Sequence, residues 1–257
     1  MELIQYELTD RVAYITLNRP EKRNALNPEL VAGLHAAFLR AKDDSQVKVV
    51  ILQANGEVFS AGADLAYLQQ LQHNSFEDNL ADSAALKGLF YNIYTLPKPV
   101  IAQVEGHAIA GGCGLASVCD IVFSVPEAKF GYTEVKIGFI PALVACFLVR
   151  KLGEARTKEL LLSAELIDAE TAVRYGLINF VINRENIRES VKNYANNLSN
   201  NTSAQSIELT KELLNMAQNL PLEESLEAAV KLNAQARNTA DCKRGIAAFL
   251  NKEKLTW

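Results

Sequence analysis

The chain has 257 residues, of which 49% are hydrophobic and 22% are charged, and this balance excludes a disordered or fibrous protein. Its 26 Lys and Arg residues against 30 Asp and Glu residues give a formal net charge of −4, so we expect no nucleic-acid partner and no anionic membrane partner. The length predicts one large domain, or one domain with an appended helical segment.

The four cysteines, Cys113, Cys119, Cys146 and Cys242, form no CxxC pair, and no spacing of His, Cys, Asp and Glu resembles a metal site. The N-terminal residues MELIQYELTDR lack the basic-then-apolar pattern of a signal peptide. The longest apolar stretch, 142–149, is far shorter than the roughly 20 residues that cross a bilayer. We therefore expect a reduced, cytoplasmic protein without a bound metal.

The first half of the chain alternates strand patterns with helical patterns. Residues 2–8 and 11–17 predict a β-hairpin, and Asn27 with Pro28 predicts the N-cap and first turn of a helix. Further strands are expected at 47–53, 99–105, 120–125 and 177–182. Helical patterns lie between them, near 76–95, 112–119, 143–151, 155–163 and 168–175. This alternation predicts an α/β protein with crossover connections.

The pattern changes near residue 185, where strand patterns stop. Four successive amphipathic helices are expected at 185–200, 202–220, 222–238 and 241–252. We therefore divide the chain into an α/β core at 1–190 and a helical C-terminal region at 191–257. The sequence shows no internal repeat and no long flexible linker.

Two junctions between a strand and a loop are rich in small residues. The segment EGHAIAGGCGLASVCD at 105–120 follows one buried strand, and NGEVFSAGADL at 55–65 follows another. Small residues let a ligand approach backbone N–H groups, and a helix N-terminus adds free donors. Two such junctions indicate a pair of N–H groups that converge on one carbonyl oxygen. Close packing of helix against strand is the alternative explanation.

At these motifs the chain resembles the crotonase superfamily, also called the enoyl-CoA hydratase/isomerase family. The resemblance rests on segments in family order and spacing: RNAL at 23–26, FSAGADL at 59–65, HAIAGGCGLASVCDI at 107–121 and KFGYTEVKIGFIP at 129–141. It implies a β-β-α spiral core with a C-terminal helical trimerisation region. It also implies an acyl-CoA thioester as ligand, and a homotrimer or a hexamer built from two trimers.

The resemblance assigns the reaction to three residues. The backbone N–H groups of Ala63 and Gly111 correspond to the oxyanion hole, and Glu134 corresponds to a catalytic carboxylate. Coenzyme A is part of the substrate, and no separate cofactor is expected. The residues expected to bind its parts are Arg19, Lys22, Arg23, Ala25, Ala61, Asp64, Leu65, Phe249 and Lys252.

The resemblance assigns these binding residues to different parts of coenzyme A. Arg19, Lys22 and Arg23 are available to the phosphates, although a solvated turn also explains their charges. Ala25 is expected beside the pantetheine. Asp64 is expected to stabilise its own loop, since a carboxylate aimed at a developing enolate would oppose it. Phe249 and Lys252 correspond to positions that complete the adenine pocket, sometimes from a neighbouring subunit.

The chain departs from the family's hydratases at one position. Their first catalytic glutamate is replaced by Gly114, whereas the second is present as Glu134. We expect reversible hydration of a 2-enoyl-CoA by Glu134 acting as acid and base, since one carboxyl group can perform both proton transfers. The wider sequence resembles methylglutaconyl-CoA hydratases of leucine degradation. A Δ3,Δ2-enoyl-CoA isomerase and a non-catalytic CoA-binding scaffold remain alternatives.

Two further polar residues near the Gly-rich junction receive structural interpretations. His107 is read as a hydrogen-bonded structural group, because a lone His beside small residues is more often structural than catalytic. Cys113 is read as a core residue, since no His near it in the sequence would activate a thiol.

Overall fold

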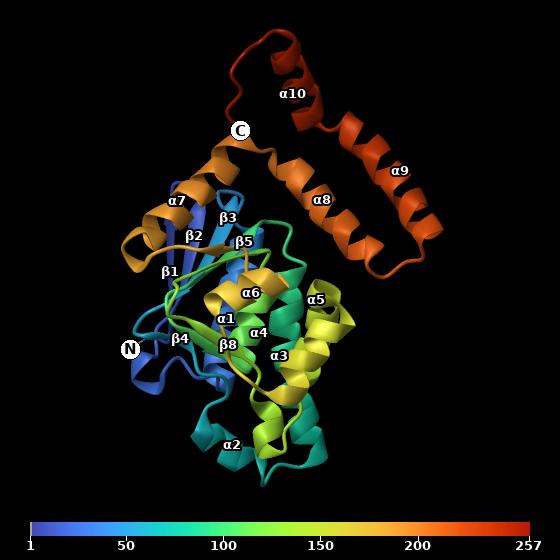
Figure 1. The fold of residues 1–257 in the computed structure, drawn as a ribbon. Helices are drawn as coiled ribbons and strands as arrows, with labels where there is room; N and C mark the ends of the chain where they lie inside the picture. Colours follow the sequence, from blue (N-terminus) through green and yellow to red (C-terminus); the bar gives the residue numbers. More distant parts are fainter. Residues whose placement is uncertain (1) are drawn as a thin grey trace.

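The computed structural model describes residues 2–257 and shows a mixed α/β core with a helical extension (Figure 1). Six strands form the main sheet in the order β1-β2-β3-β5-β7-β10. Their bounds are Ile4–Thr9, Val12–Leu17, Val49–Ala54, Val100–Val104, Ile121–Ser124 and Phe180–Val181. The β1–β2 pair is antiparallel, as the predicted hairpin requires, and the other pairs are parallel.

Helices cover the main sheet, which explains why its central strands are apolar almost throughout. Helix α1 (Pro28–Asp43) contacts β1, β2 and α3 (Phe76–Tyr94), and α7 (Arg184–Asn201) contacts β2, β3 and β5. The predicted N-cap is confirmed, because the Asn27 side chain accepts a hydrogen bond of 2.9 Å from Leu30 N. Leu30, Leu34 and Phe38 of α1 are fully buried, each contributing about 1.5–3 kcal/mol of apolar burial.

A second, smaller sheet lies at the ends of the main strands. It has the order β4-β6-β8-β9, with bounds Val58–Ser60, His107–Ile109, Lys129–Gly131 and Ile167–Asp168. These strands were not predicted, because two or three residues are too few to show an alternation of apolar and polar side chains.

The two sheets are connected by a repeated path of the chain. Strands β3, β5 and β7 of the main sheet lead into β4, β6 and β8 of the small sheet. Each short strand then leads into a helical turn: α2 (Leu65–Leu71), α4 (Gly111–Ser117) and the 3-10 helix η2 (Glu134–Ile137). Because β4, β6 and β8 are parallel neighbours, the three loops that follow them lie side by side.

Most predicted helices are confirmed, and one predicted strand is shorter than expected. Helix α5 (Ala142–Ser163) is interrupted at Gly153, which has a non-helical φ of 73°. This break lies between the two helices predicted there. Only Phe180–Val181 forms a strand within the predicted range 177–182. The N–H groups of Leu177 and Ile178 instead bond to the carbonyl of Ala172, closing the end of α6 (Ala169–Tyr175).

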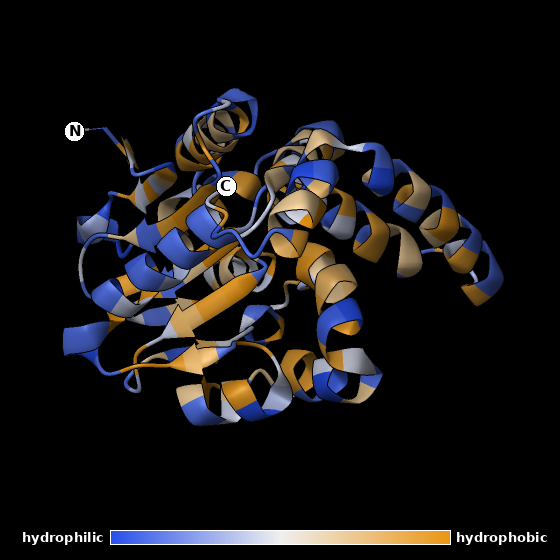
Figure 2. Cartoon of the chain, turned by 90° about the horizontal axis from the view of Figure 1, so that it is seen from above, coloured by the Kyte–Doolittle hydropathy of each residue, from blue (hydrophilic) through white to orange (hydrophobic). Residues whose placement is uncertain are grey.

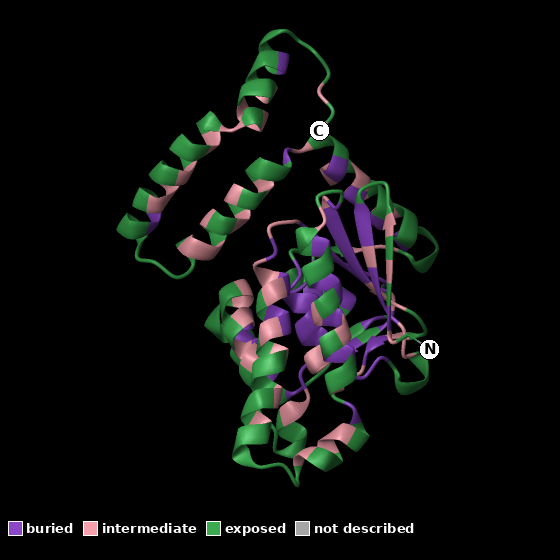
Figure 3. Cartoon of the chain, turned by 180° about the vertical axis from the view of Figure 1, so that it is seen from behind, coloured by how far each residue is buried: buried purple, intermediate pink, exposed green. Residues whose placement is uncertain are grey.

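The last three helices form an extension that we call the C-terminal arm: α8 (Ala204–Ala217), α9 (Leu222–Asn238) and α10 (Ala240–Leu250). Figures 1 and 3 show the arm leaving the core beyond α7, with most of its surface exposed. Its attachment includes an ion pair of 2.5 Å between Lys211 of α8 and Asp120 of the core. The predicted domain boundary at residue 190 falls inside α7, which packs on the main sheet.

The core between the sheets and helices contains large aromatic side chains. Phe38, Phe59, Phe90, Phe130 and Tyr132 are each less than 2% exposed. All four cysteines are free thiols, and Cys113 and Cys119 lie within this core. In the described range 2–257, no helix combines the length and the apolar character needed to cross a membrane.

Candidate active site

The small sheet brings the three predicted catalytic positions together. Ser60 pairs with Ala108, which in turn pairs with Phe130 on the next strand. Ala63, Gly111 and Glu134 follow these aligned residues by three, three and four positions. The three predicted residues therefore occupy three adjacent loops at one edge of the sheet.

Gly62 permits the close approach of the first two loops. Its φ is 87°, and a Cβ atom at this position would lie 2.8 Å from Ala110 Cβ and 3.5 Å from Gly111 N. Any side chain would push the two loops apart and would be strained in this conformation. Gly62, one of the small residues noted in the sequence, is thus required by the contact between the loops that carry Ala63 and Gly111.

The backbone N–H of Ala63 is left free by the pairing around it. Leu26 and Ala63 form a parallel bridge in which Leu26 N donates to Gly62 O at 2.6 Å and Asp64 N donates to Leu26 O at 2.8 Å. Across residues 2–257, the Ala63 N–H finds no acceptor. Ala63 is exposed, so a ligand can reach this donor.

The N–H of Gly111 is free for a different reason. Gly111 is the first residue of α4, where an N–H has no acceptor within the helix, and it finds none elsewhere in the described chain. The preceding residue, Ala110, has a φ of 49° and a ψ of −124° and donates its own N–H to Gly131 O at 2.8 Å. Such a conformation costs about 1–3 kcal/mol and is typical of functional sites.

Glu134 begins η2 and combines partial exposure with one buried oxygen. Its Oε2 atom is buried and lacks a hydrogen-bond partner within residues 2–257. Burial raises the pKa of this carboxyl above its ordinary value, although its own backbone N–H opposes the shift. A carboxyl group with a raised pKa keeps its proton to a higher pH than an ordinary glutamate, which suits it to proton exchange.

The position of the missing glutamate is filled by apolar side chains. A Cβ atom at Gly114 would lie 2.5 Å from Val144 Cγ1 and 3.0 Å from the Phe90 ring. Val144 and Phe90 are both buried in the core. The structure therefore holds no space for a second carboxylate on the same turn of α4.

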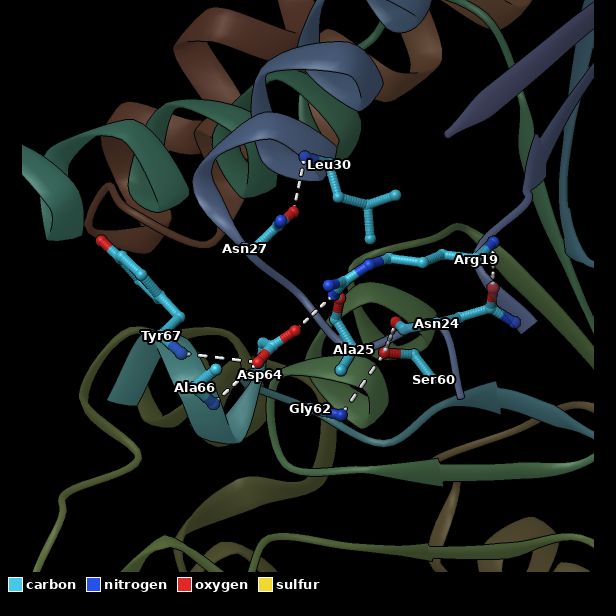
Figure 4. A network of polar contacts seen from close by, with 10 residues as sticks. All are labelled: Arg19, Asn24, Ala25, Asn27, Leu30, Ser60, Gly62, Asp64, Ala66 and Tyr67. Carbon is cyan, nitrogen blue, oxygen red and sulfur yellow. Dashed lines mark hydrogen bonds and ion pairs between the residues drawn. The ribbon is translucent and has the colours of Figure 1, made fainter. Parts of the chain in front are cut away.

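Asp64 holds the loop that carries Ala63, in keeping with the role predicted for its carboxylate. Its Oδ1 caps α2 by accepting from Ala66 N at 2.8 Å and Tyr67 N at 3.4 Å (Figure 4). Its Oδ2 forms an ion pair of 2.5 Å with Arg19. Burial raises the pKa of Asp64, but these hydrogen bonds outweigh that effect and hold the pKa below its ordinary value.

The other predicted binding residues fall into two groups. Lys22 and Arg23 are exposed on and beside the 3-10 helix η1 (Pro20–Lys22), near buried Ala25, partly exposed Ala61 and exposed Leu65. In contrast, Phe249 and Lys252 lie at the end of the C-terminal arm. Figures 1 and 3 place α10 and α2 at opposite ends of the molecule, so one chain does not bring Phe249 or Lys252 to the loops.

Sequence reasoning missed the side chains that join the loops. Asn24 is fully buried and its Nδ2 donates to Asn55 O and Val58 O, each at 2.8 Å. Ser60 Oγ donates to Asn24 O at 2.8 Å (Figure 4). Tyr67 was also missed, and its hydroxyl donates to Asp82 at 2.5 Å, which ties α2 to α3. The RNAL motif carried the signal for Asn24, because Asn tolerates the left-handed φ of 51° found there.

The two structural interpretations of polar residues agree with the geometry. His107 Nδ1 accepts a hydrogen bond of 3.1 Å from the backbone of Lys129, across the small sheet. Complete burial raises the pKa of the Cys113 thiol to about 12, so it is protonated at neutral pH.

Known proteins with similar sequences and folds agree on one family. The family model for enoyl-CoA hydratase/isomerase matches residues 7–257. A Thermus thermophilus protein that carries an enoyl-CoA hydratase name is 44% identical over 241 residues, covering 94% of this chain and 95% of that protein. Crotonyl-CoA hydratase of Syntrophomonas wolfei is 34% identical, covering 98% of this chain and 96% of its own length.

The fold gives the same answer. The crystal structure of an enoyl-CoA hydratase from Mycobacterium smegmatis superposes with a TM-score of 0.94 at 27% identity, covering 100% of this chain and 99% of that one. An enoyl-CoA hydratase structure from Shewanella pealeana has a TM-score of 0.94 at 29% identity, covering 99% of this chain and 96% of that one. The chain therefore belongs to the enoyl-CoA hydratase/isomerase family and has the crotonase fold.

Proposed function

We propose that the protein catalyses the reversible addition of water to a 2-enoyl-CoA, which gives a 3-hydroxyacyl-CoA. The observation that carries this proposal is that three adjacent loops of the small sheet carry two free N–H groups, on Ala63 and Gly111, and the unpartnered carboxyl oxygen of Glu134. Similarity to proteins named enoyl-CoA hydratase supports the same reaction.

The proposed mechanism uses the two N–H groups as an oxyanion hole. The thioester oxygen accepts hydrogen bonds from Ala63 N and Gly111 N, which stabilise the negative charge of an enolate. Ionised Glu134 takes a proton from a water molecule while the water oxygen bonds to C3 and the double-bond electrons move to the enolate. The resulting carboxylic acid then returns the proton to C2. Loss of one such donor typically lowers kcat by about 10² to 10³.

One observation favours isomerisation of a 3-enoyl-CoA as a second candidate. Val144 and Phe90 fill the space beside Gly114, so no second carboxylate holds a water from α4. Moving a proton between C2 and C4 needs a single carboxylate and a stabilised dienolate, and Glu134 with the two N–H groups meets that need.

For the ligand, we propose that Lys22 and Arg23 contact coenzyme A phosphates and that Ala25, Ala61 and Leu65 line its pantetheine arm. The exposure of Lys22 and Arg23 supports their contact with phosphates. The place of Ala25, Ala61 and Leu65 beside the loop that carries Ala63 supports their contact with the pantetheine arm. We propose that Phe249 and Lys252 act from a neighbouring subunit, because their own arm holds them far from these loops. A branched, methylglutaconyl-like acyl group and a cytoplasmic location stay predictions.

We also propose that the arm assembles the protein as a trimer. Leu222, Leu226 and Val230 recur every fourth residue along α9 and are 76%, 58% and 65% exposed. Figure 2 shows the apolar residues that run along the arm. A stripe of this kind is unfavourable in water, and burial against another copy removes it from solvent. A trimer paired into a hexamer is the larger form of the same proposal.

A substrate panel tests the proposed reaction. Purified protein is incubated with crotonyl-CoA and, separately, with 3-hexenoyl-CoA, and products are identified by their mass and by the absorbance of the conjugated 2-enoyl thioester. Hydration predicts a gain of one water on crotonyl-CoA, with loss of the conjugated thioester absorbance. A 2-enoyl product from 3-hexenoyl-CoA without any gain of water would assign isomerisation instead. Tight binding of both thioesters without turnover of either would identify a non-catalytic CoA-binding protein.

A further inference from the structure

Arg19 differs from the other basic residues of the predicted coenzyme A loop. Lys22 and Arg23 are exposed, whereas the Arg19 side chain is 14% exposed. Its Nη1 donates to Ala25 O at 3.1 Å and to Asp64 Oδ2 at 2.5 Å. Figure 4 shows the guanidinium directed at Asp64, which places its charge against the loop that carries Ala63.

Asp64 is fixed at both its side chain and its main chain. One carboxylate oxygen accepts a hydrogen bond from Arg19, and the other accepts from the N–H groups of Ala66 and Tyr67. The Asp64 side chain is 9% exposed. Its own N–H donates to Leu26 O at 2.8 Å. The residue after Ala63 therefore has little freedom to rotate.

The residues before Ala63 are held by the same partner loop. Gly62 O accepts from Leu26 N at 2.6 Å, and Ala61 N donates to Arg23 O at 3.0 Å. Within the segment 61–64, Ala63 alone has an N–H with no acceptor in the described chain. The direction of this N–H is thus set by contacts on both sides, and the Arg19–Asp64 pair is the only ion pair among them.

We propose that Arg19 is a positioning residue that acts through Asp64 to fix the Ala63 N–H in the direction of the thioester oxygen. This inference rests on the proposed function of the site. An oxyanion donor must lie about 2.7–3.1 Å from the developing charge, and a displacement of about 1 Å can lower the rate by about 10²-fold. Arg19 then contributes to stabilisation of the transition state, whereas Lys22 contributes to the binding of coenzyme A.

A double-mutant cycle tests this division of roles. We expect Arg19→Met and Asp64→Asn each to lower kcat by about 10-fold to 100-fold, with KM changed less than about threefold. Asn keeps an oxygen that caps α2, so Asp64→Asn removes the ion pair while retaining the cap. The double variant should be no slower than the slower single variant, because both changes remove the same interaction. Arg19→Lys should recover part of the lost rate.

Two control variants separate this effect from other losses. Lys22→Met should raise KM with little change in kcat, as expected for a group that binds the substrate uniformly. Arg156→Met removes an exposed ion pair with Glu159 away from the site and should leave both constants unchanged. Additive losses in the cycle, or a raised KM with an unchanged kcat in Arg19→Met, would overturn the proposal and assign Arg19 to the phosphates.

A spectroscopic measurement gives a second readout that does not need turnover. Acetoacetyl-CoA forms an enolate that absorbs in the near ultraviolet, and an oxyanion hole increases the bound enolate fraction at a given pH. Saturated Arg19→Met should show a smaller enolate fraction than wild type, while saturated Lys22→Met should match wild type. Equal fractions in wild type and Arg19→Met would contradict the positioning role. Absence of turnover in wild type would refute the proposed function without affecting this comparison.

Discussion

The partly buried carboxyl of Glu134 lowers the stability of the folded protein at neutral pH. Its buried Oε2 has no partner in the described chain, and burial raises its pKa. The unfolded carboxyl titrates near its ordinary value of 4.5. Between that pH and the higher pKa of the folded state, the folded protein holds a proton that the unfolded chain has lost. Stability therefore falls as pH rises through this window, and the loss persists at higher pH.

The first prediction concerns the stability of Glu134→Gln. The variant removes the ionisation, so its Tm should exceed that of wild type at pH 7 and approach it below pH 4. Thermal unfolding followed by circular dichroism at the two pH values measures this difference. Glu165→Gln, which changes an exposed glutamate, is the control. The difference in Tm between Glu134→Gln and wild type should be larger at pH 7 than at pH 4. A difference that is smaller at pH 7 would contradict the assignment of burial as the cause.

The second prediction is the pH dependence of the rate. In the proposed mechanism hydration begins with ionised Glu134, so kcat/KM should rise with pH through the raised pKa of this carboxyl in the free enzyme. We expect the midpoint of this acid limb above pH 4.5. Initial rates with crotonyl-CoA across a pH series, corrected for any loss of folded protein, give the midpoint. A midpoint below pH 4.5 would show that another group controls the limb.

The third prediction concerns Gly114, which the sequence identifies as a missing carboxylate and the structure identifies as a packed position. The added methyl of Gly114→Ala would overlap Val144 and Phe90, and overpacking of this kind costs about 1–3 kcal/mol. Chemical denaturation should show this loss in the free energy of unfolding of Gly114→Ala. The substitution Val144→Ala should then lower the free energy of unfolding less in the Gly114→Ala background than in wild type. Independent, additive losses would show that the two side chains do not compete for space.

At the scale of elements, the long segments were predictable and the short ones were not. The hairpin, the capped helix α1 and the four C-terminal helices have sustained periodicity or strong caps, and the structure contains all of them. Strands β4, β6 and β8 have three residues each, and their pairing depends on distant parts of the chain. The family resemblance named Ala63, Gly111 and Glu134, but local sequence could not show that these three strands align them. The roles of Asn24 and Asp82 depend on partners more than ten residues away.

The fourth prediction concerns the attachment of the C-terminal arm. The Lys211 side chain is 12% exposed and bonds both Asp120 and Lys98 O. In Lys211→Met, Asp120 keeps its bond to Val100 N but loses its ion pair, so α8 should open more often. Hydrogen exchange of the α8 amides should become faster, while exchange in β3 stays unchanged. Arg156→Met again serves as the control, and unchanged exchange in α8 would show that other contacts attach the arm.

At the scale of the whole molecule, a repeated path of the chain builds the site although the sequence shows no repeat. Each β-β-α unit delivers one residue, because its second strand pairs with the equivalent strand of the next unit. Pairing of backbones does not require similar side chains, which explains why the repeat cannot be read from the sequence. The C-terminal arm follows a different rule, since its apolar face finds few partners within its own chain.

The fifth prediction concerns the proposed trimer. Leu226→Glu combined with Val230→Glu places two carboxylates on the exposed apolar face of α9, so association should weaken and the monomer should become populated. Sedimentation velocity measures the change from trimer, or hexamer, to monomer. Gln235→Glu adds a charge to the opposite side of α9 and should leave the assembly intact. A wild-type protein that sediments as a monomer would contradict the proposal directly.

The most direct test of the central claim is the rate of crotonyl-CoA hydration by Glu134→Gln compared with wild type. Gln keeps the size of the side chain but cannot carry the proton between water and C2. We expect a folded variant that binds acetoacetyl-CoA with an affinity near that of wild type and has a kcat at least about 10³-fold lower. A Glu134→Gln variant that forms 3-hydroxybutyryl-CoA at the wild-type rate would contradict the role of Glu134 as acid and base.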